Sequence, residues 1–248
     1  MNPWLILPLL AAGWLAGTLI NYLADVLVQE RRITSVGCMH CREKLNWLDY
    51  LLVKPCTGCG TAREWRAWAV QILAAAAILV LWVWPPEKLG FWIALPLFVY
   101  LALVMVMDLQ YRVVLHPVSI FGAVLGLGFG IWMNGLVSTV IGGAAGFGIM
   151  FGLYLLGGLF TKWMARRRGE EIDEVALGFG DVNLSGVLGL MLGWPKIWIL
   201  LLFAILLGGL ISGLILIGMV LVRKYKAFTA IPYAPFLIVV AVVFLFLA

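Results

Sequence analysis

Two aspartates and four cysteines are the residues of this sequence that could support chemistry. Asp108 ends an apolar run over 91–107, and Asp181 follows a Gly178-Phe179-Gly180 turn. Two carboxylates that lie close together cannot both ionise easily, so they share one proton and titrate as a unit. Such a pair can activate water with one member and protonate a leaving group with the other. Gly178 and Gly180 would let the backbone approach another segment closely. Alternatively, either aspartate is an interfacial end charge or a helix N-cap.

The four cysteines form two Cys-x-x-Cys turns, Cys38/Cys41 and Cys56/Cys59, which are separated by 14 residues. Each turn can direct two thiolates at one ion, and two turns complete a tetrahedral zinc shell with sulfur at about 2.3 Å. A site with four protein ligands is closed to substrate, so we expect a structural Zn²⁺ and interpret His40 as a bystander. The alternative is two unrelated thiol pairs.

The composition excludes a water-soluble globular protein. Of the 248 residues, 64% are hydrophobic and 12% are charged, and the mean hydropathy is +1.08. Soluble domains are about half apolar and about a quarter charged. The chain is long enough for about eight membrane spans of roughly 20 residues each.

We predict an all-α polytopic membrane protein with about eight transmembrane helices and a small cytoplasmic zinc-binding insert. Its parts are a first helix at 1–27, an insert at 28–66 that holds every cysteine, and a membrane core of seven helices at 67–248. A sixth helix of 13 residues would rise only about 20 Å, so it needs flanking residues or a protein-lined, thinned surrounding. The expected helices are 4–27, 67–84, 91–107, 117–133, 136–160, 182–194, 197–222 and 231–247.

The basic residues predict the orientation of these helices. With the loops placed alternately on the two sides, all Lys and Arg residues except Lys88 and Lys196 fall on one side. That side is expected to be the cytoplasm, with both termini outside. The insert then lies where zinc is favoured over disulfides. Asp108 and Asp181 lie on the same side, on different helices, which permits a carboxylate pair.

Three other polar residues lie in or next to apolar segments. We interpret Asp25, near the cytoplasmic end of the first helix, as a charge that reaches the membrane surface, because no acidic partner is evident. Asn21, one turn earlier, is expected to hydrogen-bond to a neighbouring helix. His116 precedes Pro117 and is interpreted as a helix boundary residue.

These motifs resemble those of the bacterial type IV prepilin peptidases, which are GxGD intramembrane aspartic proteases. The resemblance covers most of the chain and rests first on Gly178–Asp181, on Asp108 with the Leu-Gln-Tyr-Arg that follows it, and on the cysteine insert. Two weaker likenesses are Gly-Thr-Leu-Ile-Asn at 17–21 and the start of the last helix, with Pro232 and Pro235.

The resemblance implies a membrane aspartic endopeptidase with Asp108 and Asp181 as its catalytic residues. It would cleave basic leader peptides from type IV prepilins and pseudopilins at the cytoplasmic face of the bacterial inner (plasma) membrane. Its partners would be these substrates and the lipid bilayer, with no nucleic acid, and its oligomeric state is left open. The supporting residues would be Gly178, Gly180, Asn21, Pro232 and Pro235.

Many members of that family also methylate the new N-terminus with S-adenosylmethionine. A glutamate linked to this activity stands 12 residues after the last cysteine, where this chain has Gln71. An amide cannot take a proton from the substrate ammonium. We therefore expect methylation to be weak or absent, and S-adenosylmethionine to be a cofactor only if another acid such as Glu64 substitutes. The chain also departs from the family at Val26, Val28 and Asn183, where Arg, Pro and Lys are usual.

Two functions of other classes compete with the protease. One is a zinc-containing membrane scaffold that uses the aspartates only for packing. The other is a proton-coupled transporter, which should show ionisable residues near the middle of the membrane and repeated halves. Here the acidic residues are confined to span ends and loops, and the halves do not repeat. The protease is therefore the favoured hypothesis.

Overall fold

The computed structural model describes residues 3–30, 36–38, 41, 43–45, 47–168, 178–221 and 232–247. The chain divides into two compact units, Met1–Tyr111 and Arg112–Ala248, each with its own packing. Asp108 and the cysteines belong to the first unit, and Asp181 belongs to the second. His40, interpreted above as a bystander, lies outside the described residues.

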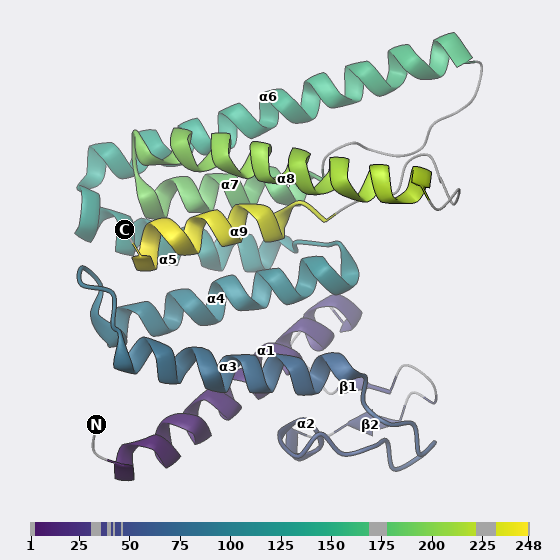
Figure 1. Cartoon of the computed structure of the whole chain (residues 1–248), viewed down its shortest axis with the longest axis vertical. Coiled ribbons are helices and arrows are strands. Elements are labelled where there is room, and N and C mark those ends of the chain that lie inside the picture. Colours follow the sequence, from purple (N-terminus) through teal and green to yellow (C-terminus); the bar gives the residue numbers. More distant parts are fainter. Residues whose placement is uncertain are drawn as a thin grey trace. The chain divides into compact units, whose positions relative to one another are not determined.

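The first unit contains three long helices and the described part of the insert (Figure 1). A short 3₁₀ turn, η1 (Pro3–Leu5), leads into the first helix. Two short strands pair antiparallel, with Val36 opposite Leu45. The long helices are α1 (Ile6–Glu30), α3 (Trp65–Val83) and α4 (Gly90–Tyr111), and the insert supplies β1 (Val36–Gly37), β2 (Lys44–Leu45) and α2 (Trp47–Leu51).

Glycines on α1 allow this helix to pack directly against α3. A Cβ atom on Gly13 would lie 2.4 Å from the Cα of Ala75, and one on Gly17 would lie 2.7 Å from the Cα of Gln71. No side chain fits at either position, so the two backbones touch. In a bilayer, where lipid is as apolar as leucine, close backbone packing of this kind drives helix association.

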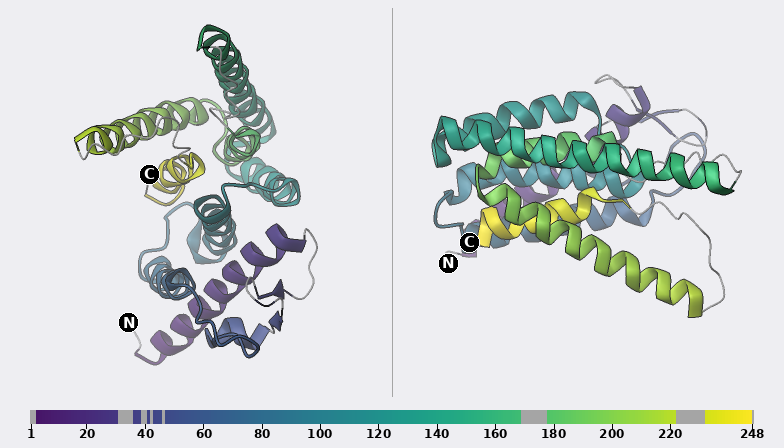
Figure 2. Two further views of the ribbon diagram at one scale, coloured as in Figure 1. Left: turned by 90° about the vertical axis from the view of Figure 1, so that its right-hand side faces the viewer. Right: turned by 90° about the horizontal axis from the view of Figure 1, so that it is seen from above.

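The second unit is a bundle of five helices in the described residues. Pro117 stands in the first turn of α5, where its missing N–H costs nothing. Figure 2 shows α9 beside α8, and the two helices are in contact. The elements are α5 (His116–Asn134), α6 (Leu136–Arg168), α7 (Phe179–Leu192), α8 (Lys196–Leu221) and α9 (Ala234–Val242), which a π-helical turn, η2 (Val243–Leu247), continues.

These helices confirm the expected all-α membrane architecture. Among the described residues, six helices are long and apolar enough to cross a membrane: α1, α3, α4, α5, α6 and α8. The shorter apolar helices Phe179–Leu192 and Ala234–Phe246 correspond to the other two expected spans. The main difference is that α6 continues to Arg168 rather than ending at 160. Its last turns contain Lys, Met, Ala and Arg, which favour helix even beyond the apolar segment.

The short helix α7 is enclosed by protein, which is one of the two alternatives that its length allowed. Ten of its 14 residues are buried, and it packs against α5, α6 and α8. The approach to α6 is close enough that a Cβ atom on Gly142 would lie 2.5 Å from the carbonyl oxygen of Gly189. Neighbouring helices thus replace the lipid that a 14-residue segment could not span by itself.

This packing predicts opposite effects for two glycines of the same helix. Gly142→Ala should lower the thermal unfolding midpoint, by a destabilisation of about 1–3 kcal/mol, because α6 and α7 must separate to admit a methyl group. Gly148→Ala is the control: nothing lies within 4 Å of a Cβ atom there, so the gain in helix propensity should leave the midpoint unchanged or raised. Thermal unfolding of the two variants in one detergent measures the difference, and equal midpoints would contradict the packing argument.

Candidate functional site

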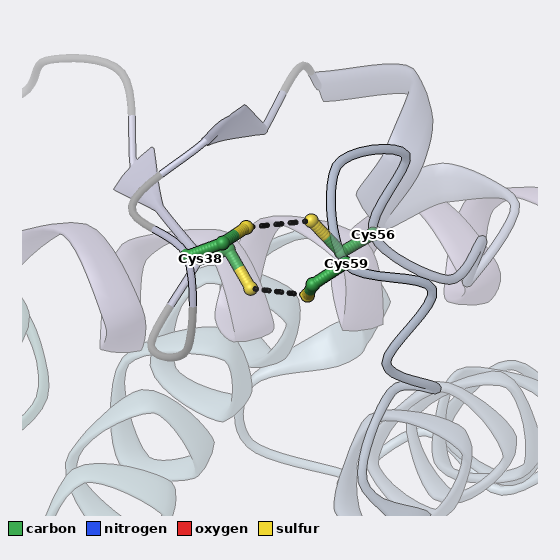
Figure 3. Close-up of side chains that lie close together, drawn as sticks. Cys38, Cys56 and Cys59 are labelled. Carbon is green, nitrogen blue, oxygen red and sulfur yellow. Dashed lines mark hydrogen bonds between the residues drawn. The ribbon is translucent and has the colours of Figure 1, made fainter.

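The four cysteines converge on one point in the first unit (Figure 3). Their sulfur atoms all lie within 4.8 Å of one another. The Sγ atoms of Cys38 and Cys59 are 3.7 Å apart, and those of Cys41 and Cys56 are 3.4 Å apart. A zinc ion with four sulfurs at about 2.3 Å requires sulfur–sulfur edges of about 3.8 Å. The cysteines are free thiols, so the donor set and its geometry fit one zinc ion.

Backbone hydrogen bonds hold each cysteine turn in this shape. The N–H of Cys38 donates to the carbonyl of Glu43 at 2.8 Å, and that of Cys56 donates to the carbonyl of Thr61 at 3.0 Å. The N–H of Gly60 closes the second turn on Cys56 at 2.8 Å, with a φ of +69° that glycine adopts without strain. These bonds fix the shape of the two turns that carry the thiols.

The thiols of the cluster do not ionise alike. Hydrogen bonds from the hydroxyl and backbone N–H of Thr61 lower the pKa of Cys59 to about 6. A backbone hydrogen bond at Glu43 lowers the pKa of Cys41, but the neighbouring thiols raise it by more, to about 12. Four thiolates at this spacing repel one another, and a divalent cation supplies the charge that lets all four ionise.

The insert shares a small hydrophobic core with α1. Buried Cys38, Leu45, Tyr50 and Cys56 pack with Val26 of α1, and the half-buried Tyr22 of α1 packs against them. A second contact is the indole N–H of Trp14, which donates to the carbonyl of Leu51 at 2.7 Å. An arginine at position 26, usual in the resembled family, would place a charge in this core. Val26 is therefore accounted for by packing.

The interpretation of Asp25 as a surface-reaching charge is wrong. Asp25 is only 4% exposed. Its carboxylate accepts hydrogen bonds from Tyr50 at 3.0 Å, from Arg66 at 2.8 Å and from Tyr111 at 2.8 Å. Arg63 adds an ion pair at 3.8 Å. The sequence did not indicate these contacts, because the partners of Asp25 lie 25 to 86 positions further along the chain.

Polar side chains one and two turns earlier on α1 also bond to other elements. Asn21 is 1% exposed, and its amide N–H donates to the carbonyl of Ala67 on α3 at 3.1 Å. This confirms the expected bond to a neighbouring helix. Gln71 is fully buried and donates to Thr18 at 3.0 Å and to the carbonyl of Tyr50 at 2.8 Å. The bond to the Tyr50 carbonyl requires an N–H donor, which a glutamate lacks.

Asp108 is 6% exposed and lies in the last turn of α4. The helix continues for three residues beyond Asp108, to Tyr111, so Asp108 is not its terminal residue. It has interacting neighbours in the structure. Asp108 therefore lies near the end of its helix, as an interfacial end charge would, but its side chain is buried.

Asp181 is 7% exposed and lies in the first turn of α7. The N-cap of this helix is Gly178, and the N–H of Asp181 donates to the Gly178 carbonyl at 3.1 Å. The alternative of Asp181 as the N-cap is therefore wrong. A Cβ atom on Gly180 would lie 2.9 Å from the Cβ of Val114, so Gly180 lets α7 begin against the 112–115 segment.

The second unit adds neighbours of Asp181 that the sequence did not identify. Tyr233, at the N-cap of α9, has a buried hydroxyl. Burial and, to a smaller extent, the Asp181 carboxylate raise its pKa to about 12. Pro235 stands in the first turn of α9, and Pro232 lies just before it. The signal that could have indicated Tyr233 is its position between these two prolines.

A groove of about 540 Å³ borders the start of α7. At its polar end, Nδ1 of His116 lies 3.4 Å from Nδ2 of Asn183, and the His116 ring meets the Phe179 ring edge-on, 6.3 Å away. Ser119 and apolar residues or glycines of α5, α6 and α7 line the rest of the groove. His116 begins α5, as expected of a boundary residue, but it also contacts the α7 segment that carries Asp181.

The cysteine cluster predicts about one zinc ion per purified chain. Changing Cys38 or Cys56 to Ser should remove the metal, because a tetrahedral shell that has lost one thiolate binds zinc far more weakly. The insert should then be cut faster by protease, while Ser185→Ala, in the second unit, serves as a control with normal zinc content. Metal analysis and limited proteolysis provide the measurement. A freshly reduced protein without zinc would refute the assignment.

Comparison with known proteins gives related sequences. Residues 95–213 match the sequence model of the Type IV leader peptidase family. The chain is 29% identical over 199 residues to a prepilin leader peptidase/N-methyltransferase of Aeromonas salmonicida, which covers 79% of this chain and 63% of that relative. A protein of the same name from Aeromonas hydrophila is 28% identical over 210 residues, which cover 81% of this chain and 67% of the relative.

The chain thus spans 63% of the length of the Aeromonas salmonicida relative. No solved structure matches it. The matched family region begins within α4, ends within α8 and includes both Asp108 and Asp181. Residues 95–213 of this chain are thus similar to the type IV leader peptidase family.

Proposed function

We propose that this chain is a membrane aspartic endopeptidase that removes basic leader peptides from type IV prepilins and pseudopilins. One observation carries the proposal: the family region contains two aspartates, and each is buried at the end of an apolar helix. A carboxylate placed in apolar surroundings costs free energy, so such residues usually serve a function. The relatives named above are prepilin leader peptidases.

The proposed reaction uses Asp108 and Asp181 as a pair that shares one proton. The ionised carboxylate takes a proton from water, and the resulting oxygen nucleophile attacks the carbonyl carbon of the scissile peptide bond. The protonated carboxyl then gives its proton to the leaving nitrogen as the carbon–nitrogen bond breaks. The products are a leader with a new carboxyl group and a mature segment with a new amino group.

The proposed setting is the bacterial inner membrane, with the active site facing the cytoplasm. The helices are those of a multi-pass membrane protein, and the asymmetric distribution of Lys and Arg supports this orientation. A substrate with a basic leader and a hydrophobic segment would keep the leader in the cytoplasm and its apolar part in the bilayer. The scissile bond would then meet the span ends that carry the aspartates.

The proposed zinc has a structural role, with Cys38, Cys41, Cys56 and Cys59 as its ligands. When bound, the zinc ion would join the two cysteine turns of the insert, and its four protein ligands would leave no coordination position open for a substrate. Its effect on catalysis would pass through the packing of the insert against α1.

The carboxylate pair predicts that neither aspartate is dispensable. Asp108→Asn and Asp181→Asn should each lower the cleavage rate by about 10²–10⁴-fold, the usual contribution of general acid–base catalysis. Zinc content and expression should stay normal. Cleavage of a purified prepilin in detergent is the assay.

The control for this experiment is Glu87→Gln, which changes an exposed acid between α3 and α4. It should cleave at the native rate. Asp25→Asn is unsuitable as a control because Asp25 is bonded to several elements. Near-native activity of either catalytic variant would reject the pair.

We further propose that N-methylation by this chain is weak or absent, although the names of the relatives include N-methyltransferase. The support is Gln71, whose amide already donates two buried hydrogen bonds and offers no carboxylate to accept a proton from an ammonium. Methylation with S-adenosylmethionine would require another acid, such as the exposed Glu64, to accept the proton from the substrate ammonium.

Mass spectrometry of the mature N-terminus tests this proposal. After incubation of purified chain, prepilin and S-adenosylmethionine, we expect the mass of the cleaved, unmethylated segment. Omitting the methyl donor gives the reference mass. A species heavier by one methylene group, formed only with the donor, would contradict the proposal without affecting the peptidase assignment.

A further inference from the structure

We propose that Asp25 is a positioning residue for Asp108, and that it acts through Tyr111 by fixing the end of α4 against the zinc insert. This inference rests on the proposed peptidase function, in which Asp108 is one of the two reacting carboxylates. Asp25 itself does not contact substrate in this scheme. All the contacts that carry the inference lie within the first unit of the chain.

The carboxylate of Asp25 joins four elements of that unit. It comes from α1, and its partners are Tyr50 of α2, Arg66 of α3 and Tyr111 of α4. Arg63, which leads from the insert into α3, lies 3.8 Å away and also stacks on the Tyr50 ring, with its guanidinium carbon 3.8 Å from the ring centre. A buried charge with several partners holds them in one arrangement, because moving any of them leaves a buried polar group unpaired.

Tyr111 connects this carboxylate to the proposed catalytic residue. It stands three positions after Asp108, so both project from neighbouring positions on one face of α4. The Tyr111 hydroxyl donates to Oδ1 of Asp25 at 2.8 Å, the same oxygen that accepts from Arg66. This bond holds the last turn of α4 from the side of α1.

The backbone just after Tyr111 also requires support. Arg112 has a φ of +53°, in the left-handed region that non-glycine residues rarely adopt. Such a conformation persists only where the surrounding structure determines it. Tyr111, which bonds to Asp25, directly precedes Arg112 in the chain. In this scheme the bond keeps the final turn of α4 from unwinding, and so keeps Asp108 in place.

The insert contributes to the same arrangement from its other side. Tyr50 lies in the small core that also contains Cys38 and Cys56. Its hydroxyl donates to Asp25 at 3.0 Å. The metal ligands and the end of α4 are thus linked through a single carboxylate. Zinc would influence cleavage without taking part in it.

Tyr111→Phe is the sharpest test, because it removes one hydroxyl and leaves the ring, the charges and the cysteines in place. In the purified full chain, kcat for prepilin cleavage should fall about 10- to 100-fold, since a displacement of about 1 Å at a reacting group has effects of this size. The KM should stay within about twofold, and zinc content should be unchanged. Asp25→Asn should lower kcat at least as much, and the double variant should lose less than the product of the two single losses, because both changes break one bond.

Trp14→Phe is the matched control. It also removes a hydrogen bond between α1 and the insert, the one from Trp14 to the carbonyl of Leu51, but it does not touch α4. Its kcat should remain within about twofold of the native value. An equal loss of kcat in Trp14→Phe and Tyr111→Phe would overturn the proposal, since any loosening of the insert would then suffice. Native kcat in Tyr111→Phe would overturn it as well.

Hydrogen exchange of the amides over 107–111 gives a readout that does not need activity. Exchange should be faster in Tyr111→Phe and Asp25→Asn and unchanged in Trp14→Phe. If the native chain did not cleave prepilin, the peptidase proposal would fail, while this pattern would still establish that Asp25 fixes the end of α4. Unchanged exchange in Tyr111→Phe would refute the positioning role whether or not the chain cleaves prepilin.

Discussion

A buried carboxylate in a membrane protein must be paired, and this requirement organises the first unit of the molecule. Asp25 lies on an apolar helix, where an unpaired charge would cost several kcal/mol. Two arginines and two tyrosine hydroxyls provide its partners, and they come from α2, α3, α4 and the segment that leads into α3. The positions of the insert and of the end of α4 follow from this requirement. Asn21 and Gln71 obey the same rule nearby, since each donates to a carbonyl on another element.

Glycine contacts provide the second organising principle, because apolar side chains alone do not drive helices together in lipid. In the first unit, Gly13 and Gly17 bring α1 onto α3, and in the second, Gly142 and Gly189 bring α6 onto α7. The enclosed α7 can therefore be short and can carry a carboxylate in its first turn. The same close packing leaves a groove beside Asn183 and His116, whose polar groups lie at the α7 end that holds Asp181.

The cysteine insert combines a cluster of four thiols that could hold a metal with a hydrophobic core that it shares with α1. Its own apolar content is small, and Val26 and Tyr22 complete the packing around Cys38 and Cys56. A module of this size gains much of its folding free energy from a metal. Its attachment to α1 at Trp14, Tyr22 and Asp25 means that a folded insert and a correctly placed first helix support each other. The departure from the resembled family at Val26 has a packing explanation, whereas nothing in the structure explains the departure at Val28.

The sequence by itself determined the features that depend on local composition and spacing. Apolar runs of sufficient length predicted the helices, because a span must satisfy its backbone internally. Two Cys-x-x-Cys turns predicted a cluster of thiols, and the motifs around Asp108 and Asp181 predicted the similarity to type IV leader peptidases. Only the tertiary structure decided the contacts of Asp25, because its partners are far away in sequence and no periodic pattern reveals them. It likewise decided that Gly178, not Asp181, caps α7, that Gln71 acts as a donor, and that Tyr233 lies near Asp181. These features arise where buried polar groups of one element find their partners on elements that are distant in the chain. Local sequence does not indicate which elements will come into contact.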